Sequence, residues 1–505
     1  METTPSGDES PQLGAPTSLW MGDSDWAEFS PLQADLDIQA LVIGSGITGL
    51  TAARLLAEEG MTVAVIDAQG LCTGVTGFTT AKLSALQSTI YTDLSKTWGD
   101  EVAAAYAGAN LAAIESVRRR VAEDGIECDL QSQTAYTYAE SRASLPRVEA
   151  EVEAAQRAGL NASFTTESDL PYDIQGAVRL DDQAQFHPRR YCRGLLDEFV
   201  RRGGFAFERT RALDISSGDG TVTTDRGTIR ADVVIVASHI PFVNTGGYFA
   251  RMTASRSYAI AFEPAGTPID GMYISVDRPI RSIRSAGGST IVGGESHRVG
   301  GDSDTRRRYR ALETWSRERF GAQRIDFHWS AHDYRSVDGL PYVGPLGRSG
   351  RVFLATGYAK WGLTNGTIAA EIMVDLALRR QNQWGDLFDS KRLAVRQSLP
   401  GLVRANAAVA MRYVTDRLAR PRADAIDRLL PGQGGVVLVE GEKVAAFRTE
   451  DGVVHAVSAK CTHLGCQLRL NTAERSWDCP CHGSRFDLDG RMTHGPAVDD
   501  LTSKP

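Results

Sequence analysis

Several features that would assign this 505-residue chain to a class of protein are missing from it. It contains no run of about 18 apolar residues, so we expect no membrane-spanning helix. Its first residues, METTPSGDES, include neither a basic region nor an apolar stretch, which argues against a secretory signal and predicts a cytoplasmic protein. Basic residues are not in excess, and the net charge of −8 argues against general nucleic-acid binding and is typical of a soluble enzyme.

Cysteine is also scarce, since the chain has only seven. That number is too small for the disulfide scaffold of a secreted protein. Four of the cysteines lie close together near the C-terminus, and we expect the other three to be buried thiols: Cys72, Cys128 and Cys192. A chain of this length is too long for one ordinary domain and predicts two or three.

The C-terminal cysteines belong to a pair of short motifs, CTHLGC and, after twelve further residues, CPCHGS. These motifs contain the Cys–His pairs Cys461/His463 and Cys479/His482. Two thiolates on one iron and two imidazoles on the other form the ligand set of a Rieske [2Fe-2S] cluster. The same four ligands also suit tetrahedral zinc, but their spacing matches neither common zinc-binding pattern. The motifs therefore favour a two-iron cluster.

The two motifs resemble, residue by residue, the cluster loops of Rieske proteins from the cytochrome-complex branch. The resemblance implies that Cys461, His463, Cys479 and His482 are the ligands and that Cys466 and Cys481 form a disulfide between the loops. In the high-potential members a serine and a tyrosine next to the second loop donate hydrogen bonds to sulfur. Here Ser484 is present, but Phe486 stands at the tyrosine position. We expect a potential between the extremes of the Rieske range of roughly −150 to +300 mV.

A second cofactor motif lies near the start of the chain. A buried strand, IQALVI, leads into the turn GSGITG and a helix, and a second strand, MTVAVID, ends on Asp67. Gly44, Gly46 and Gly49 fit the dinucleotide fingerprint, which needs a tight turn, close approach to a pyrophosphate and close helix packing. Asp67 follows Gly49 by 18 residues, where an acid accepts the ribose hydroxyls. The motif predicts a dinucleotide site and does not distinguish FAD from NAD.

Further segments indicate FAD. They are TGVTGFTTAKLSALQ (73–87), DDQAQFHPRRYCRGLL (181–196), ADVVIVASHIPF (231–242), DYRSVDGLPYVGPL (333–346) and ATGYAKWGLTNGTIAAEI (355–372). In this order they resemble the D-amino-acid oxidase superfamily of FAD enzymes, specifically the glycine/D-amino acid oxidases (deaminating) with a C-terminal Rieske domain. The resemblance covers most of residues 36–505.

This resemblance implies an α/β (α+β) fold with three parts. A Rossmann-like FAD-dependent oxidoreductase domain is expected over 36–380, with an inserted antiparallel-sheet substrate subdomain from about 100–180 and 246–334. A helical linker over 381–425 joins it to a small all-β Rieske domain over 426–505. The N-terminal arm, 1–35, contains three large aromatic residues, so we expect part of it to pack on the body.

The family pattern also suggests residues around the flavin. A basic residue stabilises negative charge on the reduced ring, and the candidates are Lys360 and Lys82. The turn with Gly357, Gly362 and Thr364 is expected to offer backbone donors to the ring, with Thr79 and Thr80 as neighbours. Residues expected to face the substrate pocket are His297, His332, Tyr334 and Tyr358. Of these residues we take Lys360, Tyr334 and His332 as catalytic candidates.

The favoured function is therefore an FAD-dependent oxidoreductase that oxidises a C–N bond of an amino acid or amine. Electrons would pass from the flavin through the [2Fe-2S] cluster to an external acceptor, which is a protein, a quinone or oxygen. The alternative is an NAD(P)H-dependent reductase that feeds a partner oxygenase, but we find no second GxGxxG unit. A Rieske oxygenase needs a mononuclear iron site, and only 23 residues follow His482. A redox-responsive binding protein without turnover would leave the substrate subdomain unexplained.

Overall fold

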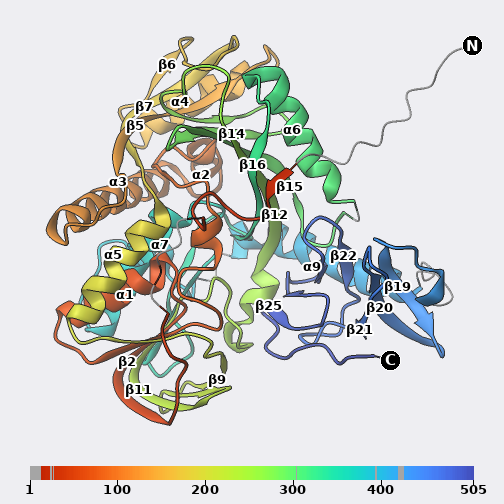
Figure 1. The fold of residues 1–505 in the computed structure, drawn as a ribbon. Coiled ribbons are helices and arrows are strands. Elements are labelled where there is room, and N and C mark those ends of the chain that lie inside the picture. The colour runs from red at the N-terminus through yellow and green to blue at the C-terminus, as the bar shows by residue number, and fades with distance from the viewer. Residues whose placement is uncertain are drawn as a thin grey trace, which may run out of the picture.

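The computed structural model describes residues 13–22, 26, 28–302, 304–392, 395–418 and 426–504. Two large sheets, of eight and ten strands, form the main body, and two small sheets form a C-terminal domain beside it (Figure 1). Within the part of the chain that the structure describes, no helix combines the length and apolar character needed to cross a bilayer.

The eight-stranded sheet carries the glycine turn. Its central strands are parallel: β2 (Leu36–Ile43), β3 (Val63–Ile66), β11 (Gly227–Val236) and β18 (Val352–Thr356). Strands β3 and β18 and the last four residues of β2 and β11 are buried, as expected for a sheet with both faces covered. The strand order is β17-β18-β11-β2-β3-β8, and β10 and β9 extend from β11. The outer strands are β8 (Phe205–Phe207), β9 (Ala212–Ser216), β10 (Thr221–Thr224) and β17 (Tyr342–Pro345).

Helices pack against one another next to this sheet. Helix α1 (Ile47–Glu58) packs against α5 (Pro188–Arg201) and α7 (Gly362–Ala377) (Figure 1). A long helix, α3, spans Asp100–Glu123. The other helices are α2 (Ile90–Trp98), α4 (Leu145–Arg157), α6 (Arg306–Phe320), α8 (Gly385–Phe388), α9 (Val395–Leu418) and the 3-10 turns η1 (Val75–Phe78), η2 (Thr245–Arg251) and η3 (Ile426–Arg428).

The ten-stranded sheet has the order β1-β16-β12-β15-β14-β13-β5-β7-β4, with β6 paired to β7. It is mostly antiparallel, as predicted, but the β1–β16 and β13–β5 pairs are parallel. Its strands are β1 (Leu13–Ala15), β4 (Lys82–Leu83), β5 (Gln131–Ala139), β6 (Ser163–Thr165), β7 (Gly176–Gln185), β12 (Met252–Phe262), β13 (Met272–Ser275), β14 (Arg281–Ala286), β15 (Ser289–Arg298) and β16 (Ile325–Ser336). Two stretches of chain supply most of it, and the contributions of β1 and β4 were not predicted.

The N-terminal arm packs on the body, which confirms the expectation from its aromatic residues. Trp20 is 2% exposed, and its indole N–H donates to the Thr79 carbonyl at 2.7 Å. The Ser18 hydroxyl donates to the Gly77 carbonyl at 2.5 Å. The arm therefore holds the loop at η1 in place.

The C-terminal domain consists of two antiparallel sheets around a core that includes Phe447, Trp477 and Phe486. The strands are β19 (Gly434–Val439), β20 (Glu442–Arg448), β21 (Val454–Ser458), β22 (Arg469–Asn471), β23 (Ser476–Asp478), β24 (Arg485–Phe486) and β25 (Met492–His494). The helical linker predicted over 381–425 contains α8 and α9, and its last part, 419–425, lies outside the described residues.

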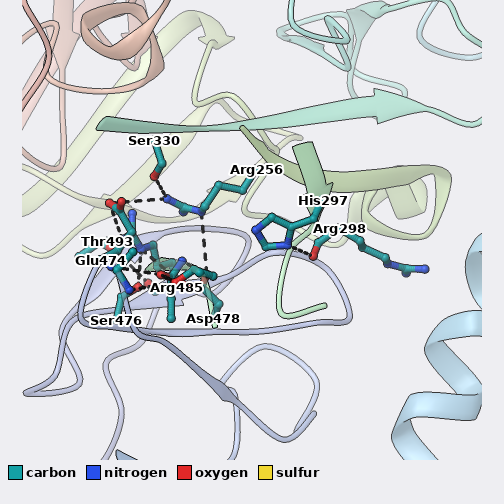
Figure 2. A network of polar contacts seen from close by, with 12 residues as sticks. Arg256, His297, Arg298, Ser330, Glu474, Ser476, Asp478, Arg485 and Thr493 are labelled. Atoms are coloured by element: carbon teal, nitrogen blue, oxygen red, sulfur yellow. Dashed lines mark hydrogen bonds and ion pairs between the residues drawn. The ribbon is translucent and has the colours of Figure 1, made fainter. Parts of the chain in front are cut away.

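A buried charge network joins this domain to the ten-stranded sheet (Figure 2). Arg256 on β12 is 1% exposed and donates to the Ser330 hydroxyl at 2.5 Å. Its guanidinium lies 4.0 Å from the Glu474 carboxylate and 3.9 Å from that of Asp478. Arg485 approaches the same two carboxylates at 3.3 and 3.5 Å. Two arginines thus balance two acids across the domain boundary, away from water, where each charge needs its partner.

Candidate cofactor sites and the cavity between them

The glycine turn has the close contacts that a dinucleotide fingerprint requires. Gly44 has a φ of +101°, which L side chains rarely adopt. A Cβ on Gly49 would lie 1.8 Å from the Gly44 carbonyl oxygen, so only glycine allows the helix to approach the strand. Helix α1 starts after Gly46 without a side-chain cap. Its first turn therefore presents backbone N–H groups and the positive end of the helix dipole to an anion.

Asp67 follows β3 at the expected position. Its Oδ2 accepts hydrogen bonds from the Ser45 backbone N–H at 2.9 Å and the Ser45 hydroxyl at 2.6 Å. Its Oδ1 accepts from the Gln69 N–H at 3.0 Å. Burial raises the pKa of Asp67 above its ordinary value, while these hydrogen bonds act in the opposite direction. The carboxylate is therefore held in one orientation beside the glycine turn, where the sequence predicts a ribose partner.

A continuous cavity runs from this turn, past strands β12 to β16 of the ten-stranded sheet, to the C-terminal domain. Eleven of the residues predicted for the flavin or the substrate line it: Gly44, Gly46, Asp67, Thr79, Thr80, Lys82, His332, Tyr334, Tyr358, Lys360 and Gly362. Gly49, Gly357 and Thr364 are among the described residues but outside the wall. Gly49 acts through packing, and the Thr364 hydroxyl accepts a hydrogen bond from Gln87 at 3.1 Å.

Lys360 extends into the cavity from an unusual turn. Ala359 and Lys360 both have left-handed backbones, with φ of 52° and 74°. Such conformations cost energy for residues other than glycine and often occur at functional sites. The Lys360 ammonium donates to the Ser257 and Ser296 hydroxyls, each at 2.7 Å. Burial lowers the pKa of Lys360, whereas the neighbouring Asp333 carboxyl raises it.

Asp333 is a buried acid whose carboxyl group interacts electrostatically with Lys360. Burial raises the pKa of Asp333 to about 7, although the Lys360 backbone N–H and ammonium both oppose that shift. Its Oδ2 has no hydrogen-bond partner among the described residues. A buried acid that titrates near neutrality beside a held ammonium is the kind of pair that occurs at catalytic sites. The sequence analysis did not single out Asp333.

Lys82 lines the same cavity from β4. Its ammonium donates to the Tyr273 carbonyl on β13. Burial lowers the pKa of Lys82 well below its ordinary value, and the Arg284 guanidinium lowers it further. Arg284 in turn donates to the Thr80 and Ala81 carbonyls, so it fixes the loop that holds Lys82. Lys82 is thus a rigidly placed amine on the wall.

His332 and Tyr334 lie on the side of the cavity next to the C-terminal domain. The Tyr334 hydroxyl is 3.2 Å from the His482 carbonyl and 3.1 Å from the Gly495 carbonyl. The His332 ring is stacked on Tyr334 at 4.9 Å and on His494 at 5.6 Å between centroids. Neither ring nitrogen of His332 has a partner among the described residues, although the side chain is buried. These residues connect the cavity to the second motif.

The remaining substrate candidates are placed differently. His297 lies outside the wall, because its ring bonds to the Tyr258 hydroxyl at 3.0 Å and the Arg298 carbonyl at 2.8 Å. Tyr358 lines the cavity, and its hydroxyl lies 3.1 Å from that of Thr48 on α1.

The donor set of the second motif fits a Rieske cluster. Cys461 and Cys479 are free, buried thiols. The rings of His463 and His482 lie 5.2 Å apart and perpendicular to each other. The Nδ1 atom of each is buried and has no hydrogen-bond partner among the described residues, which leaves both lone pairs for a metal. The two thiols form one adjacent pair and the two imidazoles another, which matches the two-thiolate and two-imidazole halves of a Rieske ligand set.

The disulfide predicted from the resemblance is present. Cys466 and Cys481 are joined at an S–S distance of 2.06 Å, and both sulfurs lie within 4.8 Å of the Cys479 sulfur. Because a disulfide sulfur carries no thiolate, these two atoms connect the loops and offer no thiolate to a metal.

Of the two sulfur-bonding side chains found in high-potential relatives, the serine is in place at the cluster site and the tyrosine is not. The pKa of Cys461 is lowered to about 7, first by a hydrogen bond with the Cys479 thiol and also by one from Ser484. Phe486 is fully buried opposite Trp477 and presents no hydroxyl. The ring of Phe249, on η2 of the main body, lies 5.1 Å from His463 and 5.0 Å from His482. The histidine side of the site therefore faces the main body.

Sequence reasoning missed several wall residues. Ser238 and His239 follow β11 and line the cavity. Ligands usually bind at the carboxyl ends of parallel strands, so the position of these two residues after a predicted strand could have identified them. Ser257 and Ser296 are brought to Lys360 by the pairing of β12 with β15, which no local motif reveals. The segment from Met492 to Val498 belongs to the other domain and could not be placed from sequence.

Comparisons with known proteins agree with this geometry. The model of the family described as FAD dependent oxidoreductase (DAO) matches residues 39–376, and that of the Rieske [2Fe-2S] domain matches 422–505. YhfW of Bacillus subtilis (strain 168), whose name describes it as a Rieske 2Fe-2S iron-sulfur protein, is 34% identical over 499 residues. That match covers 96% of this chain and 97% of the relative.

Solved structures share the fold of the main body at low identity. Glycine oxidase from Geobacillus kaustophilus superposes with a TM-score of 0.60 and 17% identity, over 71% of this chain and 100% of that one. L-proline dehydrogenase from P. horikoshii gives a TM-score of 0.59 and 16% identity, over 72% and 98%. These likenesses show the architecture of the body.

Proposed function

This chain belongs to the FAD-dependent oxidoreductase (DAO) family and carries a C-terminal Rieske [2Fe-2S] domain, and from this premise we propose that it oxidises a C–N bond of an amino acid or amine and delivers the electrons to an external acceptor. FAD supplies a two-electron hydride acceptor, and the cluster supplies single-electron transfer. The observation that carries the proposal is the single cavity, which has Lys360 on its wall and reaches His332 and Tyr334 beside the cluster ligand His482.

The polar groups on the wall support an amine or amino-acid substrate. Lys360 offers a positive charge held by two serine hydroxyls, and Asp333 offers a carboxyl whose pKa lies near 7. We assign Lys360 to stabilising negative charge that develops in the cavity. An amine that binds in its neutral form needs no strong base, so the chemistry does not require another titratable group. Glycine oxidase and L-proline dehydrogenase share the fold, and their names indicate substrates of this chemical class.

His332, Tyr334 and His494 form the proposed electron route out of the cavity. The His332 ring is stacked between those of His494 and Tyr334. The Tyr334 hydroxyl donates to the backbone carbonyl of the proposed ligand His482. Burial lowers the pKa values of His332 and His494 well below the ordinary value, so both rings are neutral at pH 7. The acceptor beyond the cluster is a protein, a quinone or oxygen.

The competing function, an NAD(P)H-dependent reductase, has less support. It needs a site for a second nucleotide, and the described residues show one glycine turn of the dinucleotide type, at Gly44–Gly49.

Anaerobic stopped-flow measurement of flavin bleaching tests the proposal. We expect at least one compound in a panel of primary and secondary amines and amino acids to bleach the flavin, and NADH to do so far more slowly. Lys360→Met should slow bleaching by the best amine by about 10²-fold, the usual cost of losing one charge-stabilising donor. Lys96→Met, at an exposed lysine of α2, is the control. Fast bleaching by NADH with no response to any amine would overturn the proposal.

A further inference from the structure

The C-terminal domain supplies part of the wall of the dinucleotide cavity. The contributing residues form β25 and the turn after it: Met492, Thr493, His494, Gly495, Ala497 and Val498. Strand β25 lies at the boundary between the main body and the small domain (Figure 1). Its residues are only half-buried, although they lie between two domains, because they border the cavity.

Hydrogen bonds join this segment to the adenosine side of the cavity. Gln69, two residues after Asp67, donates from Nε2 to the Thr493 carbonyl at 3.2 Å. Arg211 donates to the Met492 carbonyl at 3.2 Å and to the Val498 carbonyl at 3.3 Å. Gln69 and Arg211 line the cavity themselves. The same residues therefore border the nucleotide space and hold the second domain against it.

The segment is a rigid part of its own domain. Strand β25 pairs with β24, and the Thr493 hydroxyl donates to the Arg485 carbonyl at 3.2 Å. Arg485 belongs to the buried charge network that docks the domain on β12 (Figure 2). An ion pair of 3.2 Å between Arg211 and Asp500 adds a further link. The wall is thus connected to the main body at two separate places.

We infer that the Rieske domain is part of the FAD-binding site, where it closes the adenosine side of the cavity and makes flavin binding dependent on domain docking. The inference rests on FAD occupying this cavity, and it needs no substrate or turnover. By linkage, docking must tighten FAD binding by the same factor by which FAD tightens docking. Loss of flavin should therefore loosen β25, and loosening of β25 should release flavin.

Hydrogen exchange of the full-length protein, with and without FAD, tests the first direction. A peptide covering 492–500 should exchange about tenfold more slowly when FAD is bound, because FAD stabilises only the closed form. The control is β20, which lies in the same domain but outside the wall, and its exchange should be unchanged. Equal exchange of 492–500 in the two states would overturn the inference, whatever the enzyme oxidises.

A pair of variants tests the second direction. Asp500→Asn removes the ion pair with Arg211, and the dissociation constant for FAD should rise about threefold, as expected for a partly exposed pair. Glu442→Gln removes a comparable pair with Lys504 on the same domain, away from the cavity, and should leave FAD binding unchanged. A full iron content shows that the domain of a variant is folded. An unchanged dissociation constant in Asp500→Asn with full iron content would contradict the inference.

Discussion

The two cofactor sites are built in opposite ways. The four residues predicted to bind the cluster come from two loops between Cys461 and His482, and the spacing of the two motifs alone suggests them. The FAD cavity is assembled from segments between Ile43 and Val498, which includes both domains. The cluster site can therefore be read from a motif, whereas only the glycine turn and Asp67 of the flavin site can be. The part of the cavity that selects a substrate depends on how distant strands pair.

The difference extends to the polar groups that each site needs. At the cluster site, His463 and His482 lie next to each other in a single small domain, and their Nδ1 atoms have no partner among the residues that the structure describes. In the cavity, Lys360 depends on Ser257 and Ser296 from two other strands. A local site should fail as a unit when one ligand is lost, and a distributed site should fail gradually.

The largest expected effect is loss of a cluster ligand. His463→Ala should abolish the [2Fe-2S] cluster, because one iron then lacks a ligand, while flavin content stays at one per chain. Iron, sulfide and flavin analysis of protein prepared without oxygen checks both statements. His455→Ala, at a histidine of the same domain paired with Asp489, is the control and should keep the cluster. Zinc in place of iron and sulfide in the wild-type protein would refute the cluster assignment.

The next effect concerns the one local part of the flavin site. A Cβ on Gly46 would lie 3.1 Å from the Thr76 hydroxyl and would stand where the pyrophosphate approaches. Gly46→Val should therefore lose most of its FAD on dialysis while the cluster remains. Gly218→Val, at an exposed turn with no atom within 4 Å of the added Cβ, should keep its FAD. Full flavin retention by Gly46→Val would show that FAD binds elsewhere.

These two sites also show how far sequence reasoning reaches. The disulfide partners, α1 and β3 were predictable, because each belongs to a motif of residues near one another in sequence. Asp333, Ser257 and the wall at Met492–Val498 were not, because strand pairing and domain docking bring them to the cavity. Tyr334 illustrates this limit of sequence reasoning. The sequence predicts that it faces the flavin pocket, but does not reveal that its hydroxyl also donates to the carbonyl of His482 in the other domain.

A smaller effect is expected where the two regions meet. Arg256→Met leaves Glu474 and Asp478 with only Arg485 to balance them in a buried place. Removing one partner of a buried charge network costs about 3 kcal/mol or more, so urea unfolding should show a loss of that size. Arg230→Met breaks an exposed pair with Asp37 and should change stability by less than about 1 kcal/mol. Equal stability of the two variants would show that the network does not hold the domains together.

The smallest effect concerns tuning of the cluster. Phe486 is fully buried at the position where the related high-potential proteins have a tyrosine. Phe486→Tyr adds a donor next to the existing Ser484 and should raise the midpoint potential by roughly tens of millivolts, because hydrogen bonds to the sulfurs favour the reduced cluster. Phe447→Tyr, at another buried phenylalanine of this domain, is the control. An unchanged potential, with the new hydroxyl shown to reach a sulfur, would contradict the hydrogen-bond explanation.

The central claim is that the local and the distributed site work as one electron path. Freeze-quench electron paramagnetic resonance of the full-length protein, mixed without oxygen with an amine that bleaches the flavin, tests it most directly. The account predicts that the reduced-cluster signal appears after flavin bleaching, and that protein stripped of FAD gives no signal with the same amine. A cluster that stays oxidised while the flavin is fully reduced, or one that the amine reduces without FAD, would contradict the claim.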